Sequence, residues 1–97
     1  MAEISEEMIN SAKKWLRINS STVDEEVKQV MQTCLIDLMN GGVEVIDLDD
    51  PAIQQAMKLF LKSQFGYDLN AERFGQSYEF LKKSLALSGD YNKKEGN

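Results

Sequence analysis

The sequence predicts an all-α protein, a small four-helix bundle with one extended loop or arm between the second and third helices. Apolar residues recur at spacings of three and four in four separate segments, as in helices that bury one face. Each segment is bounded by residues that favour helix ends, such as serine, aspartate or glycine. Only residues 43–48 have strand-like character, and a lone ribbon of that size is marginal in water.

The first helix is predicted to begin after Ser5, a good N-cap that is followed by two glutamates favourable to the helix dipole. The basic residues of this segment are predicted to lie off the apolar face, in solvent. The polar run at residues 19–21 ends the helix. The predicted buried face consists of Met8, Ala12, Trp15 and Leu16.

The second helix is predicted to begin with a capping box, because Thr22 is followed three residues later by Glu25. Cys34 lies on its apolar stripe and is therefore predicted to be a small core residue, not a reactive thiol. The run Asn40-Gly41-Gly42 is predicted to end the helix. The whole stripe is Val27, Val30, Met31, Cys34, Leu35 and Leu38.

The third helix is predicted to run from Pro51 to about Phe65, with Asp50 as its N-cap and Gly66 as its C-cap. The segment before it, residues 43–48, is either an extended arm or an edge strand. The apolar arc of the third helix is the broadest of the four, which predicts the central position in the bundle. This arc comprises Ile53, Ala56, Met57, Phe60, Leu61 and Gln64.

The fourth helix is predicted to begin near Asn70, a possible cap, and to close at Gly89. Phe80 and Leu87 fall off its buried stripe, which leaves apolar surface on a second side. The predicted organisation is therefore one helical domain over residues 1–89, followed by a flexible polar tail over residues 90–97. The buried stripe is Phe74, Tyr78, Leu81 and Leu85.

The composition argues against catalysis. The 97 residues include no histidine, which excludes histidine-dependent nucleophiles, imidazole bases and histidine metal sites. A single cysteine excludes an intramolecular disulfide. The acidic cluster Glu44, Asp47, Asp49 and Asp50 fails the calcium-loop pattern, since the sixth and twelfth positions counted from Asp47 are Ala52 and Lys58. We therefore expect a solvated linker and a helix cap there, no metal, no cofactor and no enzyme.

The net charge of −5 argues against tight binding of nucleic acid, whose affinity comes largely from clustered lysine and arginine. The basic residues occur in three small groups, each expected on a solvated helix face: Lys13, Lys14 and Arg17; Lys58 and Lys62; Lys82 and Lys83. No apolar run approaches the roughly 20 residues of a membrane span. The acidic N-terminal residues lack a secretory apolar core, which predicts the cytosol as the place of synthesis and residence.

Three stretches occur in a distinctive order. They are Ala12–Ile18 (AKKWLRI) followed by the acidic Asp24–Val27, then Pro51–Phe60 (PAIQQAMKLF), then Tyr78–Leu85 with Gly89–Tyr91. In this order and separation they resemble the phage head–tail connector proteins, also called head-completion or adaptor proteins. The resemblance covers roughly residues 8 to 91. The residues that carry the family motif into the expected core are Trp15, Leu16, Ile53 and Ala56.

The resemblance implies a helical protein that assembles as a ring, typically a dodecamer, below the portal of a tailed phage or prophage. Such a ring lengthens the DNA channel, docks the next connector, stopper or tail protein, and performs no chemistry. The implied location is the head–tail interface of the virion, and the host cytoplasm before assembly. A net negative protein suits a conduit, because a basic lumen would hold passing double-stranded DNA at its phosphates.

Two surfaces are candidates for these contacts. The acidic segment after the second helix is the candidate subunit interface, because rings use heterologous contacts between different patches: Val43, Glu44, Val45, Ile46, Asp47 and Leu48. The outer side of the fourth helix and the following turn form the candidate portal-docking surface: Phe80, Leu87 and Tyr91. The alternative function is a small helical regulatory or DNA-binding phage protein, which would need clustered base-reading residues on one helix.

Overall fold

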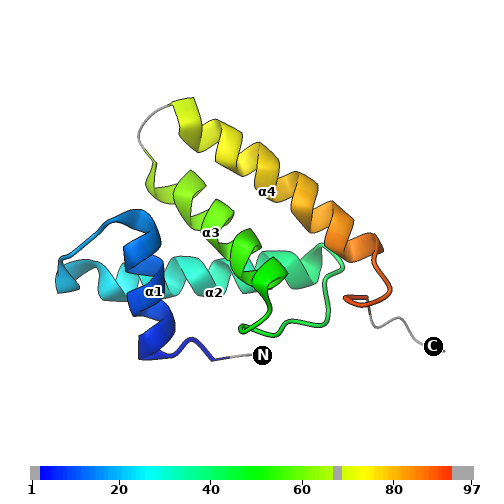
Figure 1. Cartoon of the computed structure of the whole chain (residues 1–97), viewed down its shortest axis with the longest axis horizontal. Helices are drawn as coiled ribbons and strands as arrows, with labels where there is room; N and C mark the ends of the chain where they lie inside the picture. The colour runs from blue at the N-terminus through cyan, green and yellow to red at the C-terminus, as the bar shows by residue number, and fades with distance from the viewer. Residues whose placement is uncertain (1–2, 67–68, 93–97) are drawn as a thin grey trace.

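Four α-helices and one short 3-10 helix build the protein in the computed structural model, which describes residues 3–66 and 69–92 (Figure 1). The predicted all-α class is confirmed, and the described ranges contain no strand. The elements are α1 (Glu6–Leu16), η1 (Ser21–Val23), α2 (Asp24–Asn40), α3 (Pro51–Phe65) and α4 (Leu69–Leu87).

The third helix occupies the centre of the fold, as its broad apolar arc predicts. Helices α3 and α4 run antiparallel as a hairpin, while α2 crosses behind α1 and α3 (Figure 1). Each of the other three helices packs against α3. Of the predicted arc, Ile53, Ala56, Met57 and Leu61 are completely buried, whereas Phe60 is half-buried and Gln64 is exposed.

The buried core gathers side chains from all four helices and from the loop after α2. The predicted stripe of α2 is confirmed, except that Val30 is only half-buried. Cys34 is completely buried, in agreement with its predicted place in the core. The core residues are Ile4, Ile9, Ala12, Val27, Met31, Cys34, Leu35, Leu38, Val43, Ile53, Ala56, Met57, Leu61, Tyr78 and Leu85.

Helix α1 is rotated relative to the predicted face. Its buried residues are Ile9, Ala12 and Lys13, whereas Trp15 and Leu16 are half-buried. The prediction that Lys13 faces solvent is wrong. Its ammonium lies 2.6 Å from a carboxylate oxygen of Asp24 in α2. The aliphatic part of a lysine can cover apolar surface while its charge is paired, so a basic residue occupies the buried side of this helix.

Two of the four predicted helix starts are confirmed and two are wrong. The Ser5 hydroxyl accepts the Met8 amide at 3.2 Å, and the Asp50 carboxylate accepts the Ala52 amide at 2.8 Å. The predicted capping box of Thr22 and Glu25 does not form. Thr22 lies inside η1, and α2 follows that turn without a side-chain cap. Helix α4 begins at Leu69, so Asn70 lies in its first turn and not before it.

The connection between α2 and α3 is a loop that packs on the body of the protein. Gly42 adopts φ 103°, a left-handed conformation that favours glycine, and turns the chain after α2. Val43 is then completely buried, while Ile46 and Leu48 are half-buried against the core. The apolar residues Val43, Ile46 and Leu48 of this strand-like segment therefore pack in or against the core, and none of residues 43–48 pairs in a ladder.

Residues 90–92 fold back onto this loop. The Tyr91 carbonyl accepts the amides of Glu44 and Val45 at 2.8 and 3.2 Å. Asn92 also donates from its side chain to the Ala86 carbonyl at 3.1 Å. This part of the predicted tail is thus tied to the helical body. The rest of the predicted tail, residues 93–97, lies outside the described residues.

A Gly66→Ala substitution should destabilise the fold by about 1–3 kcal/mol, a typical cost of overpacking. Gly66 has φ −82°, so backbone strain is not the reason. A Cβ at this position would stand 2.7 Å from the Lys62 carbonyl oxygen and 2.8 Å from the Ala71 Cβ. Gly89→Ala is the matched control, because no atom lies within 4 Å of a Cβ placed there. Urea unfolding followed by circular dichroism compares the two, and equal midpoints would contradict the expected clash.

Candidate functional site

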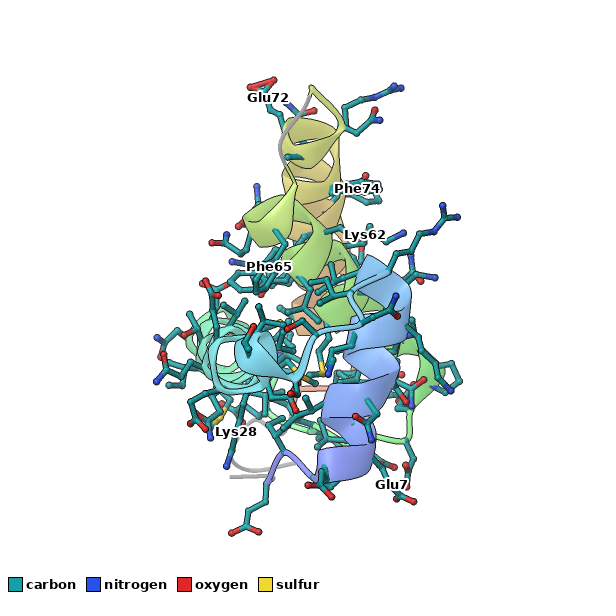
Figure 2. The ribbon with its side chains drawn as sticks, turned by 90° about the vertical axis from the view of Figure 1, so that its left-hand side faces the viewer. Glu7, Lys28, Lys62, Phe65, Glu72 and Phe74 are labelled. Atoms are coloured by element: carbon teal, nitrogen blue, oxygen red, sulfur yellow. The ribbon has the colours of Figure 1, made fainter. Side chains whose placement is uncertain are left out.

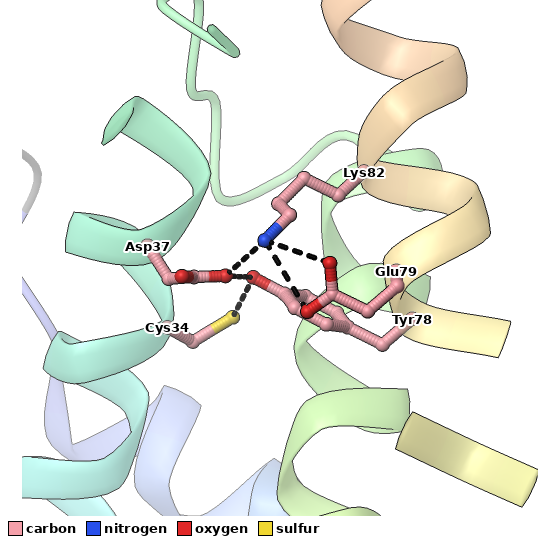
Figure 3. A network of polar contacts seen from close by, with 5 residues as sticks. All are labelled: Cys34, Asp37, Tyr78, Glu79 and Lys82. Atoms are coloured by element: carbon pink, nitrogen blue, oxygen red, sulfur yellow. Dashed lines mark hydrogen bonds and ion pairs between the residues drawn. The ribbon is translucent and has the colours of Figure 1, made fainter. Parts of the chain in front are cut away.

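A partly buried polar network joins α2 to α4. Tyr78 donates its hydroxyl hydrogen to Asp37 at 2.6 Å, and the Lys82 ammonium lies 2.8 Å from the same carboxylate oxygen (Figure 3). Lys82 also pairs with Glu79, one turn earlier in α4, at 3.1 Å. The prediction that Lys82 lies on a solvated face is therefore wrong. Periodicity placed Tyr78 in the core but gave no sign of its partners on α2.

The charge states of the residues in this network favour the contact between α2 and α4. Desolvation by itself would raise the pKa of Asp37, but hydrogen bonds from Lys82 and Tyr78 outweigh it, and the pKa of Asp37 lies below its usual range. Burial, together with the nearby Asp37 charge, raises the pKa of Tyr78. Burial lowers the pKa of Lys82 less than its hydrogen bonds to Asp37 and Glu79 raise it. At neutral pH the pair Asp37 and Lys82 is charged and Tyr78 is a neutral donor.

Cys34 sits at the inner edge of the network and has no features of a nucleophile. Its sulfur lies 4.0 Å from the Tyr78 hydroxyl oxygen (Figure 3). Burial raises the pKa of the thiol to about 12, so the reactive thiolate is absent at neutral pH. This agrees with the role predicted for Cys34 as a core residue.

The predicted subunit interface is a loop with one buried and two exposed members. The Val43 side chain is completely buried in the chain's own core, so it offers no surface to a neighbour. Glu44 and Asp47 are exposed, and Val45, Ile46 and Leu48 are half-buried. Two carboxylates of this segment accept hydrogen bonds from backbone amides: Asp47 accepts the Asp49 amide at 2.9 Å, and Asp50 caps α3. In residues 3–66 and 69–92, no group of three acidic or cysteine side chains is placed to hold a metal ion.

Tyr91 fastens this loop with both its main chain and its side chain. Besides the two amides held by its carbonyl, its hydroxyl donates to the second Asp50 oxygen at 2.7 Å. The hydrogen bond from Tyr91 and the backbone bond from Ala52 lower the pKa of Asp50. The same bond to Asp50 raises the pKa of Tyr91. The hydroxyl of this predicted portal-docking residue is thus engaged within the chain.

The other two predicted docking residues are exposed. Phe80 is 74% exposed and Leu87 is 86% exposed, and their spacing places both on the outer side of α4. Two further apolar side chains that the sequence reading did not single out are exposed on α2, namely Ile36 and Met39. Large apolar side chains in solvent on two helices leave contact surface beyond the chain's own core.

A groove that the sequence reading missed lies where the end of α1 meets the tip of the α3–α4 hairpin. Its volume is about 770 Å³. Lys62, Phe65 and Phe74 gather on the hairpin beside α1 (Figure 2), and the Lys62 ammonium lies 5.3 Å from the centre of the Phe74 ring. Two motif residues predicted for the core, Trp15 and Leu16, line this groove, whereas Ile53 and Ala56 are completely buried. The full lining is Trp15, Leu16, Arg17, Ile18, Lys62, Phe65, Gly66, Asn70 and Phe74.

No helix in the described part of the chain has the length and apolar character to cross a membrane. The arrangement as a whole is that of a small helical protein whose surface carries an acidic loop, an aromatic groove and exposed apolar side chains. The model of the phage connector protein family matches residues 8–92, and the chain belongs to this family. No curated protein and no solved structure matches the chain significantly.

An Asp37→Ala substitution should lower the free energy of unfolding by about 1–3 kcal/mol, because Tyr78 and Lys82 lose their shared acceptor. Glu44→Ala, in the exposed loop, is the control and should change it by less than about 0.5 kcal/mol. Thermal unfolding of both variants at neutral pH makes the comparison. A neutral effect of Asp37→Ala would show that the network does not stabilise the α2–α4 contact.

The low pKa of Asp37 also predicts how the stability of the fold depends on pH. Because the folded pKa of Asp37 lies below its unfolded value, its contribution is fully present above an unfolded pKa of about 4. It is lost as the pH falls through the folded pKa, where the unfolded chain binds the proton first. The wild-type chain should therefore lose more stability than Asp37→Ala between about pH 5 and pH 2. Parallel curves over this range would contradict the low pKa assigned to Asp37.

Proposed function

We propose that this protein is a head–tail connector that forms a ring under the portal of a tailed phage, extends the DNA channel and docks the next tail component. The match of the phage connector family to residues 8–92 is the observation that carries the proposal. Exposed apolar side chains on a small helical body support it, because a ring component needs surface for neighbours in addition to its own core. The proposed location is the virion, at the junction of head and tail, after synthesis in the host cytoplasm.

The proposed ring is a homo-oligomer, a dodecamer when assembled. Its subunit contacts include the exposed part of the acidic loop, Glu44 to Leu48. Portal docking uses the outer side of α4 at Phe80 and Leu87, beside the turn that Tyr91 fastens. The net charge of −5 supports free passage of double-stranded DNA, because the acidic residues outnumber the basic ones that would hold phosphates.

The alternative, a regulatory or DNA-binding helical protein, finds no support in the arrangement of the cations. Lys13 and Lys82 are paired with carboxylates of α2, which leaves them less available to phosphate. No enzymatic role is proposed, in keeping with the structural role of the family.

The double substitution Phe80→Ser with Leu87→Ser should weaken portal binding by more than tenfold while the helical content and melting temperature are retained, because both side chains are exposed. The purified chain is mixed with the portal ring from the same phage genome. Binding is measured by sedimentation, and ring-on-ring complexes are counted by electron microscopy.

Ile36→Ser is the matched control, because Ile36 is an exposed apolar residue on a different helix, α2. It should bind the portal like the wild type. Equal weakening by both changes would assign the effect to general surface hydrophobicity and not to α4. A wild-type chain that adds no ring density to the portal would overturn the connector function itself.

A further inference from the structure

Two cations line the groove at the tip of the hairpin, and neither is paired with a carboxylate of the described residues. Arg17 ends α1 in a left-handed conformation (φ 60°) and is exposed, and Lys62 lies over the Phe74 ring. Neither forms an ion pair with any residue of the described ranges. The groove therefore presents aromatic walls and a positive rim that pairs with no carboxylate of residues 3–66 and 69–92. Such a surface is complementary to an apolar segment that carries carboxylates.

The acidic loop has the opposite character. Glu44, Asp47 and Asp49 are exposed and, within the described structure, pair with no cation. Between them lie Ile46 and Leu48, whose side chains are only half-buried. The loop thus combines uncompensated carboxylates with partly accessible aliphatic surface, which is the chemistry that the groove would accept.

A single chain cannot bring the loop to its own groove. The loop leads into the first residue of α3, and the groove lies at the last turn of the same helix, so the two are at opposite ends of α3 (Figure 1). A helix of 15 residues is roughly 22 Å long. The loop is also fastened by Tyr91 through three hydrogen bonds. Only a second copy can place an acidic loop over the groove.

We propose that the acidic loop of one copy docks on the groove of the next copy, with Glu44 and Asp47 facing Arg17 and Lys62. The contact is heterologous, since the two patches are different and lie at opposite ends of α3. Contacts between two loops or between two grooves would bring like charges together and are disfavoured. The inference rests on the proposed ring-forming role and names the two faces that build the ring.

Charge reversal tests this pairing. One variant makes the groove acidic (Arg17→Glu with Lys62→Glu), and the other makes the loop basic (Glu44→Lys with Asp47→Lys). Each variant alone should associate at least roughly tenfold more weakly than the wild type at low salt, because like charges then meet. An equimolar mixture should restore association, because every groove then finds a loop of opposite charge in an alternating order. Sedimentation of the full chain over a range of concentrations gives the readout.

Lys28→Glu is the matched control for the charge change, because Lys28 lies away from the hairpin tip and outside the groove (Figure 2). It should associate like the wild type, and circular dichroism checks that all variants are folded. If the mixture associates no better than either variant alone, the pairing is overturned.

Disulfide trapping decides the orientation without a portal. Copies carrying Arg17→Cys are mixed under oxidation with copies carrying Asp47→Cys, and the native Cys34 is completely buried. Mixed disulfides should form at least tenfold faster than disulfides between identical variants. Faster formation between identical variants, or equal rates, overturns the inference.

The portal assay separates this inference from the connector function. Rings that assemble on the portal from the acidic-groove variant alone, as readily as from the wild type, overturn the loop-to-groove contact and leave the connector function standing. Loss of rings in each variant, with recovery in the mixture, supports both.

Discussion

The packing of α3 against all three other helices is the constraint on which the rest of the structure depends. Burial of its side chains on several sides fixes where α1, α2 and α4 lie, because each must cover a different part of one apolar rod. Ala56 and Met57 are both completely buried, a small residue next to a long flexible one on the same helix. Since α3 spans the fold, its two ends also set the positions of the acidic loop and of the groove (Figure 1).

Much of the fold could be predicted from local sequence. Periodicity located the four helices, the central place of α3 and the exposure of Phe80 and Leu87, because helical spacing assigns each residue to a face before any partner is known. Capping chemistry at Ser5 and Asp50 was likewise local, since the acceptor and the amide are neighbours in the chain.

The missed features depend on partners that are distant in sequence. Lys13 looks like a solvated lysine until Asp24 is brought beside it, and the bond between Tyr78 and Asp37 joins residues 41 positions apart. Likewise, the aromatic side chains of the groove come from three helices, so no single stretch of sequence predicts the groove. The family motif pointed to Trp15 and Leu16, but only the tertiary arrangement places them at the surface of a groove and not deep in the core.

The fastening of the loop by Tyr91 has a consequence for how the chain tolerates change. The carbonyl that holds Glu44 and Val45 belongs to the main chain, so many residue types at position 91 keep that pair of bonds. The hydroxyl bond to Asp50 is specific to tyrosine and is the more easily lost of the two attachments. Substitutions at position 91 would therefore remove only the hydroxyl bond to Asp50, whereas a nonsense codon just upstream would remove the carbonyl bonds as well. Loss of Tyr91 would then be felt in the loop between α2 and α3, which lies far from it in the sequence.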